Sequence, residues 1–346
     1  MILKKFKLKN RYLSNRIIAS PMCQYSAVNG LPNKWHYMHY TKLISTGVSM
    51  LIFESTAINS NGRITHKDLV LSNNKQLNSF KKIVNHLKSL KNIPIGIQLS
   101  HSGRKGSSEI PWVKHNTPLR KKKWITYAPS SIKRDKKWPL PKKLSLKGIK
   151  NIKKDFINSA ILSKKAGFDC VEVHMAHGYL LHQFLSPVAN KRNDSYGGNL
   201  KNRMNLPLQI IKGIKSRCKG MIIGARITGS DRVKGGIEID ESIKLIKELE
   251  KLKIDYVCVS SGGIYPITDL KIKKGYNVDL AEKIKKSTKI NIRVSGKIED
   301  LNYGKKIINK KKTDLVAIGR SLISNPNLIY NEDSKFIPKQ YLRAFK

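Results

Sequence analysis

The sequence predicts a single (β/α)8 barrel, a TIM barrel, and three observations support this. Short β-branched runs alternate with amphipathic segments along the whole chain, as in parallel strands joined by crossover helices. The alternation gives eight strand–helix pairs, the number that closes such a barrel. The length of 346 residues suits one barrel with loop insertions, so we expect one domain over residues 1–346.

The eight candidate strands are short runs rich in Val and Ile. In chain order they are Ile17–Ser20, Met50–Ser55, Ile95–Leu99, Cys170–His174, Ile222–Ile227, Asp255–Ser260, Ile290–Val294 and Leu315–Ile318. A doubly wound sheet is the competing architecture, but it normally opens with a glycine-rich turn after its first strand. Here that place holds Ser20-Pro21-Met22-Cys23, which favours the barrel.

Helical periodicity fills the gaps between these strands. It is clearest at Phe80–Leu90, Ile152–Ala166, Leu200–Ser216, Ile243–Leu252 and Leu280–Ser287. Residues 109–141, after the third strand, are rich in Trp, Pro and Lys and lack a core pattern. We expect them to form a long loop over the barrel mouth, either a lid or a surface excursion.

The net charge is +45, from 68 Lys and Arg against 23 Asp and Glu. Such a charge raises nucleic acid or an anionic membrane surface as partners. The lysines are, however, scattered over nearly every predicted helix, which favours a solvated surface. We therefore expect no specific nucleic-acid partner, and salt should abolish any non-specific binding to polyanions.

The four cysteines lie far apart without a CxxC pair, so the sequence predicts neither a disulfide framework nor a metal site. The N-terminal segment MILKKFKLKNR is basic but lacks the apolar stretch of a signal peptide. No stretch is long and apolar enough to cross a bilayer. We therefore expect a cytoplasmic protein that does not bind membranes.

Polar residues gather at the ends of the predicted strands, the edge of a barrel where active sites form. His174 ends a strand and His177 follows three residues later, so both imidazoles can donate to one carbonyl or phenolate oxygen. Tyr179 can present its phenol as a proton donor. An isolated His pair is more often structural or half of a metal site, so the surrounding sequence decides. The polar residues at this edge are Ser20, Cys23, Tyr25, Gln98, His101, His174, His177, Arg226, Ser260 and Arg320.

The surrounding sequence resembles the signature of the old yellow enzyme family, particularly its branch of bacterial NADPH dehydrogenases. The resemblance extends over almost the entire chain. It is carried by Val171-Glu-Val-His174-Met-Ala-His177-Gly-Tyr179, Leu185-Ser-Pro, Asn190-Lys-Arg192-Asn-Asp194-Ser-Tyr196-Gly-Gly198, Ser20-Pro-Met-Cys-Gln-Tyr25-Ser, Glu54-Ser-Thr-Ala57, Gly62-Arg-Ile-Thr65, Gly96-Ile-Gln98-Leu-Ser-His101-Ser-Gly-Arg104-Lys, Arg226 in Gly-Ala-Arg-Ile-Thr, Asp231 through Gly236, and Ala317-Ile-Gly319-Arg320. Thr228 and Gly229 depart from it, since family members often carry Ser and Ala there.

The resemblance implies FMN as the cofactor. It places the Cys23 thiol close to the isoalloxazine, where the thiol can tune the flavin potential, although without the motif a buried cysteine is by default an apolar filler. Arg226 would put positive charge near the N1–O2 edge of the flavin, and Gly319 with Arg320 would bind the phosphate. The residues implied to contact FMN are Ser20, Pro21, Met22, Cys23, Ala57, Gln98, Arg226, Gly319 and Arg320.

The resemblance also implies a reaction: hydride passes from NADPH, or alternatively NADH, through FMN to an activated alkene such as an enone, enal or nitroalkene. His174 and His177 would bind the electron-withdrawing oxygen, and Tyr179 would protonate the α-carbon. Tyr25 would line the substrate face. The tail Gln340-Tyr-Leu-Arg343-Ala-Phe345 resembles one that reaches a neighbouring subunit's site, so Arg343 would bind substrate in a homodimer or homotetramer.

Two alternatives remain open. An FMN barrel that reduces uridine in tRNA would suit the charge, but that family uses a cysteine on a different loop and carries an RNA-binding domain after the barrel, for which we expect no room after Lys346. A basic binding protein with a retired active site is the other, and the intact His174, His177 and Tyr179 argue against it. Bleaching of a yellow protein by NADPH without oxygen would discriminate.

Overall fold

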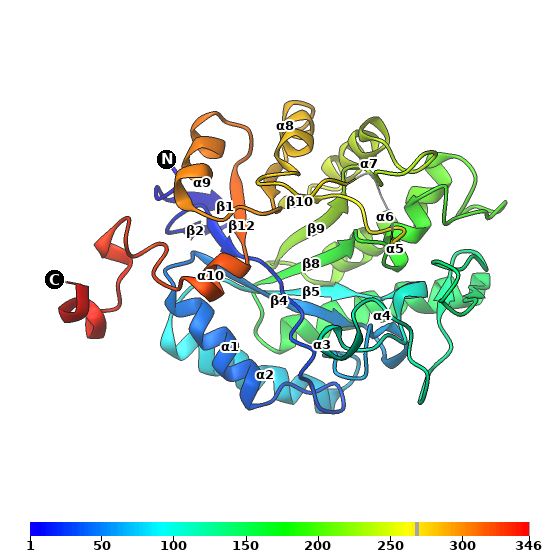
Figure 1. Ribbon diagram of the computed structural model, residues 1–346, viewed down its shortest axis with the longest axis horizontal. Coiled ribbons are helices and arrows are strands. Elements are labelled where there is room, and N and C mark those ends of the chain that lie inside the picture. Colours follow the sequence, from blue (N-terminus) through cyan, green and yellow to red (C-terminus); the bar gives the residue numbers. More distant parts are fainter. Residues whose placement is uncertain (267–269, 346) are drawn as a thin grey trace.

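The computed structural model describes residues 1–266 and 270–345 and has a closed barrel of parallel strands at its centre (Figure 1). This confirms the predicted (β/α)8 architecture, while the single-domain boundary stays a prediction. Every predicted strand is present, and β12 closes the barrel by pairing with β3. The barrel strands are β3 (Ile17–Ala19), β4 (Met50–Ala57), β5 (Ile95–Ser100), β8 (Cys170–Met175), β9 (Ile222–Thr228), β10 (Tyr256–Ser260), β11 (Asn291–Val294) and β12 (Leu315–Ile318).

Helices surround the strands, as Figure 1 shows. The five predicted helices are present, and α2 and α4 begin about one turn or more earlier than predicted, since Asn73 and Ser145 cap their first turns. The helices of the ring are α1 (Lys34–Ser45), α2 (Asn74–Leu90), α4 (Leu146–Lys165), α6 (Leu200–Arg217), α7 (Ile239–Lys251), α8 (Val278–Lys286) and α9 (Leu301–Asn309). Short helices in loops and at the end are α5 (Leu180–Leu185), α10 (Arg320–Ser324), η1 (Ser60–Gly62), η2 (Gly103–Lys105), η3 (Ser334–Phe336) and η4 (Lys339–Phe345).

The barrel interior holds an apolar layer below a polar one. An N-terminal hairpin, β1 (Phe6–Leu8) with β2 (Arg11–Leu13), contributes fully buried leucines to the apolar layer. In the polar layer Glu172 forms a buried ion pair with Arg293 and accepts hydrogen bonds from the Tyr256 hydroxyl and the Gln98 amide, both at 2.7 Å. Because the Glu172 carboxylate is paired and hydrogen-bonded, the barrel tolerates it, although Nε and Nη1 of Arg293 have no partner among the described residues.

Residues 109–141 contain more structure than the sequence predicts. They hold α3 (Pro111–Lys114) and β6 (Tyr127–Ala128), which pairs with β7 (Lys142–Lys143). Most of the segment is loop, as predicted, but Trp138 is 2% exposed, so the loop adds a buried side chain that the sequence did not indicate. A single buried Trp among lysines gives no periodic signal, which is why the sequence did not reveal it. We call residues 109–141 the lid segment.

Three further observations bear on the expected partners. None of the helices in the described ranges is long and apolar enough to span a bilayer. Within those ranges no cluster of three or more His, Cys, Asp or Glu side chains has an arrangement suited to a metal ion. The four cysteines, all described, are unpaired.

Candidate functional site

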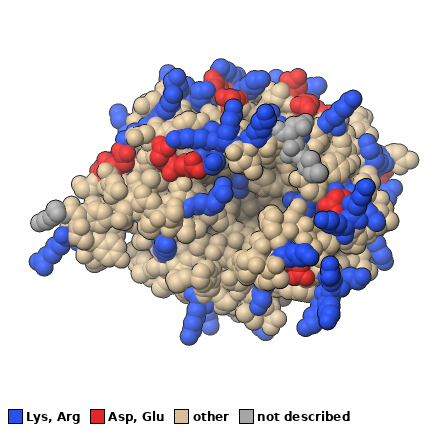
Figure 2. All heavy atoms as spheres, viewed as in Figure 1, with Lys and Arg blue, Asp and Glu red and all other residues tan. Residues whose placement is uncertain are grey.

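The carboxyl ends of the barrel strands open into two cavities. The smaller, about 200 Å³, is lined by residues that include Ser20, Met22, Arg226, Ser295, Gly319 and Arg320. The larger, about 650 Å³, lies beneath the lid segment, and its lining includes Tyr25, Lys105, Arg134 and Tyr179. Figure 2 shows this face hollowed near its centre, with Lys and Arg scattered around the hollow and over the periphery.

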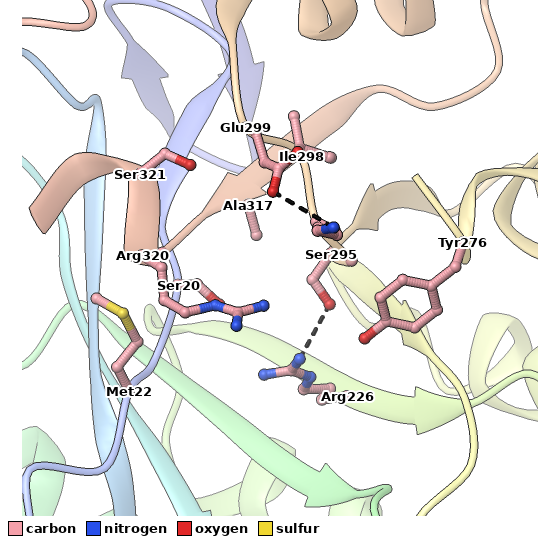
Figure 3. A pocket seen from close by; sticks show the side chains of 13 residues that line it. Ser20, Met22, Arg226, Tyr276, Ser295, Ile298, Glu299, Ala317, Arg320 and Ser321 are labelled. Carbon is pink, nitrogen blue, oxygen red and sulfur yellow. Dashed lines mark hydrogen bonds and ion pairs between the residues drawn. The ribbon is translucent and has the colours of Figure 1, made fainter. Parts of the chain in front are cut away.

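Two guanidinium groups face the smaller cavity. Arg226 from β9 and Arg320 at the start of α10 point into the same space in Figure 3. Arg226 donates through Nη2 to the Ser295 hydroxyl at 2.9 Å, while its buried Nε has no partner among the described residues. A side chain at Gly319 would meet the Met22 sulfur at 3.0 Å, so glycine keeps this space open. Such a cavity suits an anion such as a phosphate.

The two histidines at the end of β8 lie in contact. His174 Nε2 and His177 Nδ1 are 3.3 Å apart with the rings perpendicular, and His177 Nε2 lies 2.6 Å from the Ser260 hydroxyl. The Ala176 N–H donates to His174 Nδ1 at 3.3 Å, which favours the Nε2–H tautomer. Burial, with the nearby Arg226 charge, lowers the pKa of both imidazoles well below the usual value. The pair is therefore neutral at physiological pH.

His174 lies between a residue of the smaller cavity and a residue of the larger one. In the β8–β9 register it lies opposite Arg226, which lines the smaller cavity, and its ring is 4.9 Å from that of Tyr179, which lines the larger. Burial raises the pKa of the Tyr179 hydroxyl, so this phenol stays protonated. The sequence prediction that two imidazoles and a phenol come together at the barrel mouth agrees with this geometry.

The comparisons with known proteins identify the family. The model of the NADH:flavin oxidoreductase / NADH oxidase family matches residues 2–335. The chain belongs to this family. It is 36% identical to an NADPH dehydrogenase of Listeria welshimeri, covering 100% of this chain and 99% of the relative, and 37% identical to one of Clostridium acetobutylicum, covering 99% of each. A solved old yellow enzyme homologue from Zymomonas mobilis shares the fold at 21% identity, with a TM-score of 0.79 over 96% of this chain and 92% of that one.

The old yellow enzyme resemblance is thus confirmed, and this family member is an FMN-dependent oxidoreductase that uses a nicotinamide donor. The described residues fit FMN. The cavity between Arg226 and Arg320 offers an unsatisfied buried donor to an anion, and the polar Gln98 lies inside the barrel mouth beside β4. FMN combines a phosphate with a hydrogen-bonding ring. The guanidinium groups suit the phosphate, and the Gln98 amide suits the ring.

The loop after β3 places Pro21, Met22, Cys23 and Tyr25 at the same face, all partly exposed. Burial, with the nearby Glu54 and Asp68, raises the pKa of the Cys23 thiol well above its usual value. Cys23 is therefore a neutral thiol rather than a thiolate at neutral pH. A neutral thiol is compatible with the position beside the flavin ring that the resemblance implies. Tyr25 has a left-handed backbone (φ +47°), which turns its side chain into the larger cavity.

Ala57 and Gln98 lie on adjacent strands, and both are buried. Gln98 donates to Glu172 and keeps its carbonyl oxygen available. Arg343 is different: it is exposed on η4, and in the single chain nothing brings it to either cavity.

Sequence reasoning missed three residues around the site. Lys105 lies within a quoted motif but had no role, and it donates to the His177 carbonyl at 2.6 Å. Arg134 lines the larger cavity from the lid segment. Glu54 accepts from the Gln24 N–H at 2.9 Å, next to Cys23. Lys105 and Glu54 stand at the ends of motifs that carry the family resemblance, and this position could have indicated them. No sequence pattern points to Arg134.

Proposed function

We propose that this protein is an NADPH dehydrogenase of the old yellow enzyme type that reduces activated alkenes such as enones, enals and nitroalkenes. The observation that carries the proposal is the cluster of His174, His177 and Tyr179 between two cavities, one suited to a phosphate and the other open to a small molecule. The names of the Listeria and Clostridium relatives support NADPH as the donor.

FMN, when bound, supplies the redox chemistry, because it accepts hydride from NADPH and delivers it to the β-carbon of the alkene. We assign its phosphate to Gly319 and Arg320, its N1–O2 edge to Arg226, and its ring to Ser20, Pro21, Met22, Cys23, Ala57 and Gln98. The geometry in support is the convergence of Arg226 and Arg320 on one cavity.

The histidines bind and polarise the acceptor in this proposal. His177 Nε2 already donates to an oxygen, the Ser260 hydroxyl, and a substrate carbonyl or nitro oxygen would take that position as acceptor. Neutral imidazoles suit this role because they donate without holding a buried charge. Tyr179 keeps its proton at neutral pH and gives it to the α-carbon, while Tyr25 lines the substrate face.

An anaerobic absorbance experiment tests the function. The purified protein should be yellow, NADPH should bleach it, and 2-cyclohexenone should restore the colour with release of cyclohexanone. A colourless protein, or a yellow one that NADPH does not bleach, would contradict the proposal and favour a retired binding protein. On the face that Figure 2 shows, Lys and Arg do not gather into one block, so this face does not favour the uridine-reducing alternative.

A further inference from the structure

The larger cavity is lined by two cationic side chains that form no ion pair with a described residue, the buried Arg134 and the partly exposed Lys105. Lys105 and Arg134 both line it, and the acidic residue among its described lining is Glu109, which is only partly buried. Asp135, the residue next to Arg134, raises the pKa of that guanidinium through its charge, but it forms no ion pair with it. A buried cation is stabilised most by an anion in direct contact, and the described lining of this cavity places none on Arg134.

Arg134 is the more informative of the two. It is 5% exposed, and its guanidinium lies over the Trp138 ring at 4.8 Å to the centroid. It donates to the Asn116 side-chain carbonyl, whereas its buried Nε has no partner among the described residues. A neutral amide and an aromatic face orient this guanidinium, and no carboxylate among the described residues bonds to it.

Hydrogen bonds from Arg104 hold the backbone just before Arg134 in place. Arg104 donates to the Ile132 and Lys133 carbonyls at 3.2 and 3.4 Å, and to the Ile264 carbonyl at 3.0 Å. These bonds join the lid segment to the loop after β10. Arg134 is therefore held at the cavity rather than free to turn into solvent.

Lys105 places a second positive charge closer to the reaction centre. Its ammonium donates to the His177 carbonyl and lies 4.9 Å from the centre of the Tyr179 ring. Burial, with the charges of Arg134 and Arg104, lowers its pKa to about 7. An anion in the cavity would favour the charged form of this amine.

We propose that the acceptor reduced at this site carries a carboxylate, which pairs with Arg134 while its alkene lies beside Tyr179. A carboxylate matches the forked donors of a guanidinium and compensates its buried charge. The inference rests on the proposed function and names its substrate class. The phosphate of NADPH offers the same chemistry from a second source, and the experiment separates the two.

The test uses FMN-loaded enzyme and two acceptors with the same alkene, a cyclohexenone carboxylate and its methyl ester. Wild type should reduce the carboxylate with a kcat/KM roughly tenfold or more above that of the ester, as a charge-assisted contact predicts. Arg134→Gln should abolish that preference. Lys136→Gln, which removes an equal charge from an exposed position of the lid segment, should retain it.

Each other outcome has a defined meaning. An equal loss with both acceptors in Arg134→Gln, or no preference in wild type, would overturn the inference. A loss confined to flavin reduction by NADPH, with NADH unaffected, would assign Arg134 to the donor phosphate and also overturn it. If wild type is reduced by NADPH but reoxidised by neither acceptor, the proposed function itself fails.

Discussion

At the scale of single residues, His174 and His177 form a chain of hydrogen bonds that ends on the Ser260 hydroxyl. Replacing both with Ala should weaken binding of a phenol or enone by roughly tenfold, because the His177 donor to its oxygen and the His174 contact that orients this donor are both lost. FMN should be retained, since its phosphate contacts are elsewhere. Titration of the flavin absorbance with p-hydroxybenzaldehyde measures the loss. Wild-type affinity in the double variant would show that the imidazoles do not bind the acceptor.

Glu54 illustrates a residue whose environment the sequence does not reveal. A register shift in β4 between Phe53 and Ser55 leaves Glu54 on the same side as Phe53, where it accepts a hydrogen bond from the Tyr40 hydroxyl at 3.0 Å. Burial raises the pKa of this carboxyl from 4.5 to about 8. The adjacent His36 has a pKa lowered to about 4 by burial, so both groups are neutral near pH 6.

Glu54 should make the protein less stable as the pH rises. Because its folded pKa is above the unfolded value, the native state binds more protons between about pH 5 and 8, and the free energy of unfolding falls with pH in that window. The fall is at most about 1.4 kcal/mol per pH unit for one proton. Glu54→Gln should flatten this slope. Urea unfolding from pH 5 to 9 measures it, and an unchanged slope would assign the pH dependence to another group.

The cluster of His174, His177 and Tyr179, to which we assign the chemistry, was predictable from its place at the end of a strand together with the family resemblance. The sequence did not predict Arg134, whose role depends on where the lid segment folds. Nor did it reveal the bulge at Glu54, since an extra strand residue leaves the apolar pattern intact. Long-range packing decides both positions.

At the scale of elements, the loop that carries His177 and Tyr179 is held by a buried His–Asp pair. His182 on α5 accepts from the Gly178 N–H at 2.7 Å and contacts Asp231 at 2.6 Å. The Asp231 carboxylate also accepts from the Ser186 hydroxyl at 2.6 Å and the Ile237 N–H at 2.8 Å. Asp231 thus joins the loop after β9 to the loop after β8.

Asp231→Asn should destabilise the fold by about 3 kcal/mol, because an amide cannot accept all three of these hydrogen bonds. It should also lower kcat, since Gly178 lies between His177 and Tyr179. Urea unfolding and steady-state turnover provide the two readouts. Glu248→Gln breaks an exposed pair with Lys251 and should change stability by less than about 1 kcal/mol. Equal small effects in the two variants would mean that Asp231 does not anchor the loop.

The strands were predictable because parallel barrel strands are buried on both faces and form continuous apolar runs. The helix α1 received no prediction, and its sequence shows why. It mixes aromatic and histidine residues with few aliphatic ones, so its buried face, which includes His36, His39 and Tyr40, lacks an aliphatic stripe. The N-terminal hairpin was missed because its strands have three residues each, too short for a period.

At the scale of the whole molecule, barrel closure brings strand ends that are distant in the chain to one mouth. The C-terminal η4 lies elsewhere: Figure 1 shows it at one edge of the molecule, well apart from α5 and α3 at the site. The Phe345 ring packs at 5.7 Å from that of Tyr330, and Arg343 is exposed. Arg343 therefore lines neither cavity of its own chain, and we propose that it binds substrate in a neighbouring subunit of a homodimer or homotetramer.

A shared site makes a prediction that a self-contained site does not. Arg343→Ala should lower kcat/KM for the acceptor while FMN content is unchanged, because a guanidinium contact to the substrate is lost. When this variant is co-expressed with the His174→Ala/His177→Ala variant, half of the dimers are hybrids. In a symmetric dimer each hybrid then has one site with both lesions and one with neither, so activity should recover to about a quarter of wild type. If Arg343 acts on its own subunit, every hybrid site carries a lesion, and the mixture shows only the average of the two parents.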